Sequence, residues 1–295
     1  MYLICMKGYY NMDLTSPRTI RNIQEQFGFT FKKGLGQNFL TARNILEEIV
    51  DAAEIESGVI EVGPGFGVLT SELAQNSDKV VTIEIDERLI EVIDYTLAEY
   101  DNVKIINEDI LKLDLKKVID DEFNGEKVSI AANLPYYITT PIITKLLEEK
   151  LPIKNIVVMV QKEVAERMSA KPSTKDYGAI TVLCQYYTEP SIVANVPASL
   201  FVPPPKVDSA VLKLKVLDKP TVEVKDEGVF FRVVKAAFSQ RRKTLLNCLS
   251  ANFPIPKDEI STLLESIGIA PSRRGETLSL EEFANIADTL LQKIK

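Results

Sequence analysis

The sequence contains no histidine, and this absence removes several kinds of chemistry. Ser-His-Asp and Cys-His nucleophile systems, histidine general bases and histidine-ligated metal sites all need an imidazole. The three cysteines follow no metal-binding or redox spacing, so we expect small buried side chains at Cys5, Cys184 and Cys248. We therefore expect chemistry without imidazole and without a metal.

Long apolar runs are also missing, since no stretch reaches the roughly 18 residues of a membrane span. Residues 1–10 carry a short apolar patch with a lysine after it, which is not the pattern of a secretory signal. These features predict a cytoplasmic protein with no membrane partner. The net charge of −7 argues against indiscriminate binding of nucleic acid, so a nucleic-acid site would be a local basic patch.

The 295 residues suggest a large domain with a smaller one. Over residues 41–218, strand-like runs alternate with helical segments, which predicts a doubly wound, Rossmann-like α/β domain. The expected strands are 59–62, 80–85, 103–106, 128–132, 156–160, 190–196 and 210–216. The expected helices between them are 44–53, 69–75, 88–100, 140–150, 163–169 and one after Tyr177. Residues 219–295 predict a small all-helical domain with helices 227–238, 241–251, 257–267 and 279–294, the last opened by a capping box at Ser279 and Glu282.

Residues 1–40 are expected to form a basic amino-terminal arm packed on the α/β domain, with a short helix over 16–27. Met12 is a possible second start codon, so residues 1–11 are assigned no role, and amino-terminal sequencing of the native protein tests that hypothesis. Between residues 12 and 33, the basic residues of the arm are Arg18, Arg21, Lys32 and Lys33.

A glycine turn follows the first expected strand, in the segment Gly63-Pro64-Gly65-Phe66-Gly67. Glycines here let the backbone approach a ligand closely. The spacing is not the G-x-G-x-x-G of a dinucleotide pyrophosphate site, and Pro64 has no N–H to hold a phosphate. The turn therefore favours S-adenosylmethionine over a nicotinamide cofactor.

Two acidic residues follow the next strands. Glu84 ends the second strand, near the ~20-residue spacing after Gly63 expected of an acid that binds a ribose diol; a solvated strand-end charge is the alternative. Asp109 follows the third strand and could accept a hydrogen bond from the cofactor's exocyclic amino group, or could cap a turn. Because the carboxyl ends of parallel strands meet at one edge, these residues and the glycine turn predict one cofactor site.

The segment Asn133-Leu134-Pro135-Tyr136 follows the fourth strand. An aromatic amine is a poor nucleophile, so methylating it needs acceptors for its N–H groups, and the Asn133 side-chain oxygen and the Leu134 carbonyl are suitable. Pro135 keeps Leu134 extended, and Tyr136 offers a face on which a base can stack. Asn-x-Pro is also a common turn sequence, and its place after a strand favours the catalytic interpretation.

A proline-rich segment, 201–206, lies between two β-elements. It could be a polyproline linker or a ligand for another module, but its place favours a loop that presents Phe201. Our hypothesis is that a flipped adenine lies between Tyr136 and Phe201. Unchanged RNA methylation in a Phe201→Ala variant would refute it.

With these motifs the chain resembles the small-subunit ribosomal RNA adenine N6,N6-dimethyltransferases over nearly its whole length. Residues 33–40, Lys-Gly-Leu-Gly-Gln-Asn-Phe-Leu, look like the family's amino-terminal cofactor motif, and residues 161–167 and 239–245 are similar to further family segments. The resemblance implies a class I methyltransferase domain and a target of two adjacent adenines in the 3′-terminal hairpin loop of small-subunit rRNA. It also implies cofactor contacts from Asn38, Leu40, Gly63, Gly65, Glu84, Asp109 and Asn133.

The basic segment Arg241-Arg242-Lys243 would contact rRNA phosphates, or it is simply a basic helix start on a solvated face. The expected partner is the small ribosomal subunit, with the enzyme as a monomer. Three alternatives remain: a large-subunit rRNA adenine methyltransferase of the macrolide-resistance type, a non-catalytic RNA-binding assembly or transcription factor, and a nicotinamide oxidoreductase. The glycine spacing disfavours the last of these.

Overall fold

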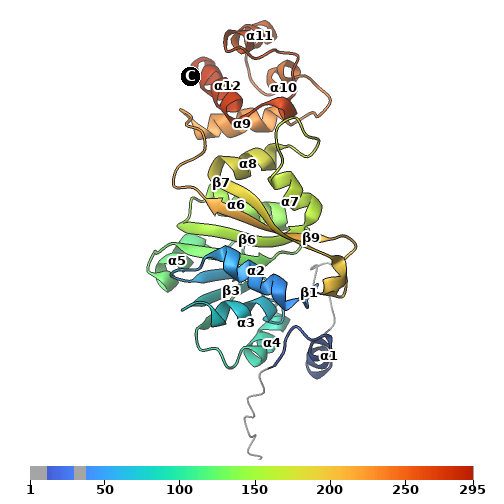
Figure 1. The fold of residues 1–295 in the computed structure, drawn as a ribbon. Helices are drawn as coiled ribbons and strands as arrows, with labels where there is room; N and C mark the ends of the chain where they lie inside the picture. Colours follow the sequence, from blue (N-terminus) through green and yellow to red (C-terminus); the bar gives the residue numbers. More distant parts are fainter. Residues whose placement is uncertain (1–11, 30–37, 295) are drawn as a thin grey trace, which may run out of the picture. The chain divides into compact units, whose positions relative to one another are not determined.

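A computed structural model describes residues 12–29 and 38–294 (Figure 1). The start-codon hypothesis for residues 1–11, the basic residues Lys32 and Lys33, and the first five residues of the expected cofactor motif lie outside the described residues.

Seven strands form one sheet in the order β4-β3-β2-β5-β6-β9-β7. The strands β2 to β6 pair parallel with one another. The chain adds strands on one side of β2 up to β4 and then on its other side from β5, so the order reverses between β2 and β5. Such a reversal leaves a crevice at the carboxyl ends of the strands. The predicted doubly wound fold is therefore confirmed. The strands are β2 (Val59–Val62), β3 (Val80–Glu84), β4 (Val103–Asn107), β5 (Val128–Asn133), β6 (Ile153–Gln161), β7 (Thr188–Val196) and β9 (Ser209–Val216).

A second, two-stranded sheet pairs β1 (Phe39–Leu40) antiparallel with β8 (Phe201–Val202). Short 3₁₀ segments occur at Glu87–Leu89, Ala198–Leu200 and Gly275–Thr277. The helices that precede β9 in the chain are α1 (Pro17–Gln26), α2 (Arg43–Ala53), α3 (Val68–Gln75), α4 (Ile90–Thr96), α5 (Leu115–Phe123), α6 (Thr139–Glu148), α7 (Lys162–Met168) and α8 (Ala179–Tyr187). Four helices follow: α9 (Glu227–Ala237), α10 (Leu245–Ser250), α11 (Lys257–Ser266) and α12 (Leu280–Ile294).

Helix α5 is missing from the sequence expectation. Five of its nine residues are charged, which hides its apolar positions in the sequence. Leu115, Val118, Ile119 and Phe123 are nevertheless buried on one face, and the Asp114 side chain caps the helix by accepting from the Lys117 N–H. These apolar residues lie three, four and eight positions after Leu115, and this helical spacing was the signal in the sequence that could have predicted α5.

The chain divides into two compact units. Of the residues that the structure describes, the first unit contains those up to Lys162 and Val193–Lys213, and the second contains Glu163–Ile192 and those from Leu214 onward. This division differs from the expected boundary at 218, because Glu163–Ile192 groups with the helices that follow. Aromatic packing explains the grouping: the ring of Tyr186 on α8 stacks on that of Phe230 on α9, with centroids 4.8 Å apart.

In the first unit, α1 begins at a Ser16 cap and a Pro17 at its first position. Its buried residues Ile20 and Ile23 belong to the hydrophobic cluster that also contains Phe39 and Phe66. The predicted helix over 16–27 is confirmed.

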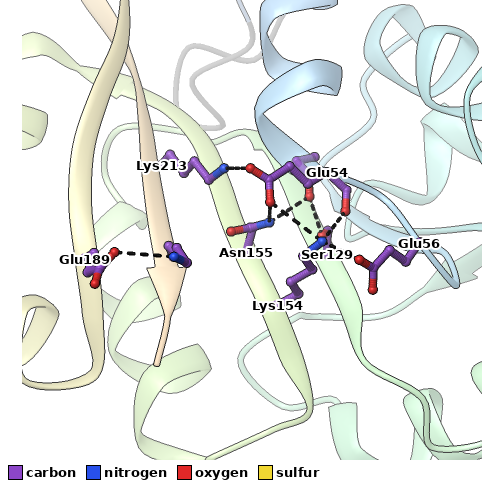
Figure 2. A network of polar contacts seen from close by, with 9 residues as sticks. Glu54, Glu56, Ser129, Lys154, Asn155, Glu189 and Lys213 are labelled. Carbon is purple, nitrogen blue, oxygen red and sulfur yellow. Dashed lines mark hydrogen bonds and ion pairs between the residues drawn. The ribbon is translucent and has the colours of Figure 1, made fainter. Parts of the chain in front are cut away.

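A polar network holds the carboxyl end of α2 against the sheet (Figure 2). The carbonyl of Ala53 accepts from Ser129 Oγ at 2.6 Å and from Asn155 Nδ2 at 3.0 Å, and Lys213 Nζ lies 2.6 Å from Glu54 Oε1. The hydrogen bond from Lys213 lowers the pKa of Glu54. These bonds tie the carboxyl end of α2 to β5, β6 and β9.

Within the described residues, no helix is both long and apolar enough to cross a membrane. The same residues contain no group of three or more histidine, cysteine, aspartate or glutamate side chains placed to hold a metal ion. Cys184 and Cys248 are free and buried as expected, and burial raises the pKa of the Cys184 thiol to about 12. Cys5 lies outside the described residues.

Candidate active site

The glycine turn after β2 exposes bare backbone at the carboxyl edge of the sheet. The Gly63 N–H donates to the Ile83 carbonyl at 2.9 Å, which extends the pairing of β2 with β3 into the turn. Gly65 has φ +60°, and a Cβ there would lie 2.7 Å from the Phe39 ring. Only glycine fits this position without strain or a shift of that ring.

A cavity of about 1050 Å³, including its open mouth, lies beside this turn. It lies where β2 to β5 end, beside the reversal of strand order. Eight of the predicted site residues line it: Asn38, Leu40, Gly63, Gly65, Glu84, Asp109, Asn133 and Pro135.

The carboxyl group of Glu84 lies in the cavity wall and is only 6% exposed. Burial raises its pKa to about 7, against the opposing effect of backbone N–H donors such as Asp86, whose nitrogen lies 2.7 Å from Glu84 Oε1. A buried carboxylate at this edge can accept hydrogen bonds from hydroxyl groups of a ligand.

Glu61, which the sequence reasoning did not select, also lines the cavity. It lies inside β2, is 1% exposed, and accepts from Thr70 Oγ1 at 2.5 Å. Burial raises the pKa of Glu61 to about 8, although the Thr70 hydrogen bond acts in the other direction. The available signal was an acidic residue inside an otherwise apolar strand.

Glu61 makes the stability of the protein depend on pH. The folded chain keeps a proton on Glu61 up to about pH 8, whereas the unfolded chain loses it near the ordinary value of 4.5. The free energy of unfolding therefore falls as pH rises between these values. From about pH 6 to about pH 9, we expect the wild type to lose on the order of 2 kcal/mol more than Glu61→Gln, measured by denaturant unfolding. Parallel pH curves for the two proteins would contradict this expectation.

Asp109 lines the cavity and also caps the turn after β4. Its Oδ1 accepts from the Leu111 N–H at 3.0 Å, and its Oδ2 lies 3.8 Å from Lys112 Nζ. The position of Asp109 is therefore compatible with both sequence interpretations, an acceptor for the cofactor amino group and a turn cap. Two apolar neighbours that the sequence reasoning missed, Ile85 and Ile110, line the cavity directly after the acidic residues.

The Asn133 side chain has a defined orientation. Its Nδ2 donates to the Asn38 carbonyl at 3.0 Å, which leaves Oδ1 as the acceptor end. Leu134 is 1% exposed, and its N–H donates to the Met159 carbonyl at 3.1 Å. In the described part of the chain, none of the backbone hydrogen bonds of turns and loops ends on the Leu134 carbonyl. Pro135 uses its own carbonyl to accept from the Ile138 N–H at 3.1 Å, at the start of α6.

Tyr136 and Phe201, the two aromatic residues proposed to hold a base, do not line the cavity that Asn133 lines. Tyr136 is half-buried, and its hydroxyl lies 2.7 Å from Ser209 Oγ. Phe201 is 3% exposed and pairs with Leu40 across the small sheet. Neither ring lines the cavity, whereas the 58% exposed Tyr137 does. Stacking by Tyr136 and Phe201 stays a prediction, which would require Phe201 to become exposed.

Arg241, Arg242 and Lys243 are exposed in the second unit. They lie in a turn before α10, so the expected helix start at 241 is wrong by four residues. Thr244 causes the difference, because its side chain caps the helix by accepting from the Asn247 N–H at 3.4 Å. A guanidinium nitrogen of Arg241 donates to the Lys175 carbonyl at 2.7 Å. Phosphate binding by these residues stays a prediction.

Comparisons with known proteins agree with these features. Residues 28–292 match the family model for ribosomal RNA adenine dimethylase. The chain is 54% identical over 285 residues to the ribosomal RNA small subunit methyltransferases A of Bacillus mycoides and Bacillus cereus, covering 95% of this chain and 98% of each relative.

Two solved structures resemble the chain. A dimethyladenosine transferase from Plasmodium falciparum has a TM-score of 0.70 at 29% identity, with 84% of this chain and 95% of that one covered. The 23S rRNA methyltransferase ErmE has a TM-score of 0.65 at 27% identity, with 86% and 100% covered. The family match spans both units and the whole cavity. The chain belongs to the ribosomal RNA adenine dimethylase family.

Proposed function

We propose that the chain transfers methyl groups from S-adenosylmethionine to N6 of two adjacent adenines in the 3′-terminal hairpin loop of small-subunit rRNA, giving N6,N6-dimethyladenosine during subunit biogenesis. Family membership makes it an S-adenosylmethionine-dependent rRNA adenine dimethyltransferase. The observation that carries the chemistry is Asn133, which ends β5 at the cavity with its oxygen held as an acceptor. The names of the 54% identical relatives support the small subunit as the source of the RNA.

The cavity residues fit S-adenosylmethionine. Gly65 lacks the Cβ that would clash with the Phe39 ring, so the turn and Phe39 can both line the cavity. Glu84 would accept from the ribose hydroxyls, and Asp109 from the adenine amino group, with Asn38 and Leu40 completing the wall. When bound, this cofactor supplies an electrophilic methyl group.

The chain's own residues activate the amine of the target base. In the first transfer, Asn133 Oδ1 and the Leu134 carbonyl would accept hydrogen bonds from the two N6–H groups, and in the second transfer one of them would accept from the single remaining N6–H. These hydrogen bonds favour a pyramidal nitrogen with an available lone pair. As the nitrogen–methyl bond forms, the bond between the methyl group and the cofactor sulfur would break and leave that sulfur as a neutral thioether. The methylated nitrogen is acidic and would release a proton to water, so no strong base is needed. Orientation supplies much of the remaining acceleration. This scheme suits a chain without histidine.

The ionisation of Glu84 should control cofactor affinity. Because the pKa of Glu84 is about 7, its carboxylate is mostly protonated near pH 6 and mostly ionised near pH 8. The ionised form is the better acceptor for ribose hydroxyls. We expect the Kd for S-adenosylmethionine, measured by calorimetry, to fall by up to about tenfold from pH 6 to pH 8. Glu84→Gln should bind more weakly and show a flatter pH dependence; an unchanged dependence would assign the effect to another group.

One experiment tests the proposed target. Purified protein and labelled S-adenosylmethionine are incubated with undermethylated small subunits, with large subunits, or with neither, and the modified nucleosides are identified. We expect dimethyladenosine in small-subunit rRNA alone. Transfer to large-subunit rRNA alone would support the rival activity of the structurally similar 23S enzyme. Cofactor binding without any transfer would favour a non-catalytic assembly factor. A monomeric enzyme that acts in the cytoplasm is part of the same proposal.

A further inference from the structure

The catalytic segment is fixed at both ends by side-chain hydrogen bonds to distant parts of the first unit. At one end, Asn133 Nδ2 donates to the Asn38 carbonyl at 3.0 Å. At the other, the Tyr136 hydroxyl lies 2.7 Å from the Oγ of Ser209. Ser209 is the first residue of β9 and is 0% exposed, so its hydroxyl has a rigid, buried location.

The residue before Ser209 anchors the proline-rich segment. The Asp208 carboxylate accepts from the Ala198 N–H at 2.9 Å and so closes the chain from 198 to 208. The Asp208 carbonyl accepts from the Lys162 N–H at 3.0 Å, directly after β6. Asp208 and Ser209 are therefore hydrogen-bonded to the start of the 198–208 loop, to the residue after β6 and to the catalytic segment.

The two anchoring segments also pair with each other. Leu40 lies opposite Phe201 in the small sheet, and both the N–H and the hydroxyl of Thr41 donate to the Leu200 carbonyl, at 2.9 and 2.8 Å. Asn133 contacts residues 38–41, Tyr136 contacts residues 200–209, and these two segments pair with each other. Moving one of them requires a change in the others.

We propose that Ser209 is a positioning residue for methyl transfer, acting through Tyr136, and that Asp208 fixes the loop from which it acts. This inference rests on the proposed function, because it assigns to Tyr136 a place beside the target base. Ser209 itself contacts no reacting atom. It holds the Tyr136 ring, and with it the backbone turn that carries the Leu134 carbonyl, in one orientation. Small errors in such an orientation cost rate more than they cost binding.

The test compares Ser209→Ala, Tyr136→Phe and the double variant with Ser129→Ala. Ser129 is a matched control, since it is 2% exposed, lies in the same sheet and donates a hydrogen bond of 2.6 Å, but to Ala53 at the network of Figure 2. Both serine variants lose one buried hydrogen bond, so thermal unfolding should show similar destabilisation. We expect kcat to fall about tenfold in Ser209→Ala, with unchanged Kd for S-adenosylmethionine, and to remain at the wild-type value in Ser129→Ala.

The double variant decides whether Ser209 acts through Tyr136. If it does, the double variant has the kcat of Tyr136→Phe rather than the product of the two effects. Multiplied effects, or equal activity of Ser209→Ala and Ser129→Ala, would overturn the proposal. Failure of the proposed function looks different: the wild type itself would not methylate small subunits. If it methylated another RNA, the same four variants would be compared on that RNA.

Discussion

Replacing Asn133 with alanine should nearly abolish methyl transfer while the protein still folds. The side-chain oxygen is the acceptor that would favour a reactive N6 lone pair, and removing one such group at an active site typically costs about 10²–10³-fold in kcat. The lost bond to the Asn38 carbonyl adds a smaller effect on cofactor affinity, because residues 38–40 line the cavity. Single-turnover transfer to undermethylated small subunits measures the first effect, and calorimetry with S-adenosylmethionine measures the second.

Asn102→Ala is the matched control. Its Nδ2 also donates to backbone carbonyls, those of Ala74 and Ser77, each at 2.8 Å, but it does not line the cavity. We expect a loss of stability with normal transfer. If Asn133→Ala kept more than about a tenth of the wild-type rate, the backbone carbonyl and positioning would account for the activation, and the assigned role of Asn133 would be wrong.

Gly65→Ala should cost the protein most of its cofactor affinity. The new Cβ would lie 2.7 Å from the Phe39 ring, and the residue would keep a φ of +60°, which costs a non-glycine residue about 1–2 kcal/mol. Either the turn or Phe39 must move, and Phe39 lines the cavity and stacks on Phe66 with ring centroids 4.2 Å apart. We expect Kd for S-adenosylmethionine to rise by on the order of 10- to 100-fold in calorimetry.

Gly28→Ala is the control that introduces the backbone strain of a positive φ without a clash of the new Cβ with a neighbouring side chain. Gly28 has φ +59°, nearly that of Gly65, but a Cβ there would meet nothing within 4 Å. It also lies away from the cavity lining. We expect a similar loss of stability in thermal unfolding and unchanged cofactor affinity. Equal affinity of the two variants would show that the cofactor does not use the close approach at Gly65.

The sequence alone determined the features that depend on residues close together in the chain, namely the strands, the residues at their ends and a helix cap. The strands that end at or just before Gly63, Glu84, Asp109 and Asn133 were predictable, because apolar runs and strand-end position are encoded within a few residues. The parallel order then brings these ends to one edge. The helix cap at Ser279 was equally local: Glu282 N–H donates to Ser279 Oγ at 3.2 Å, as the pattern predicts.

Other features depended on contacts between residues far apart in the sequence, which no local pattern specifies. Whether Tyr136 presents its ring or anchors its hydroxyl depends on Ser209, 73 residues away, and the orientation of Asn133 depends on Asn38, 95 residues away. Glu61 becomes a buried, weakly acidic group only because the sheet and α3 enclose it. The sequence determined the kind of chemistry through its residue types, and the tertiary structure decided which atoms are held to perform it, because orientation comes from long-range hydrogen bonds and burial.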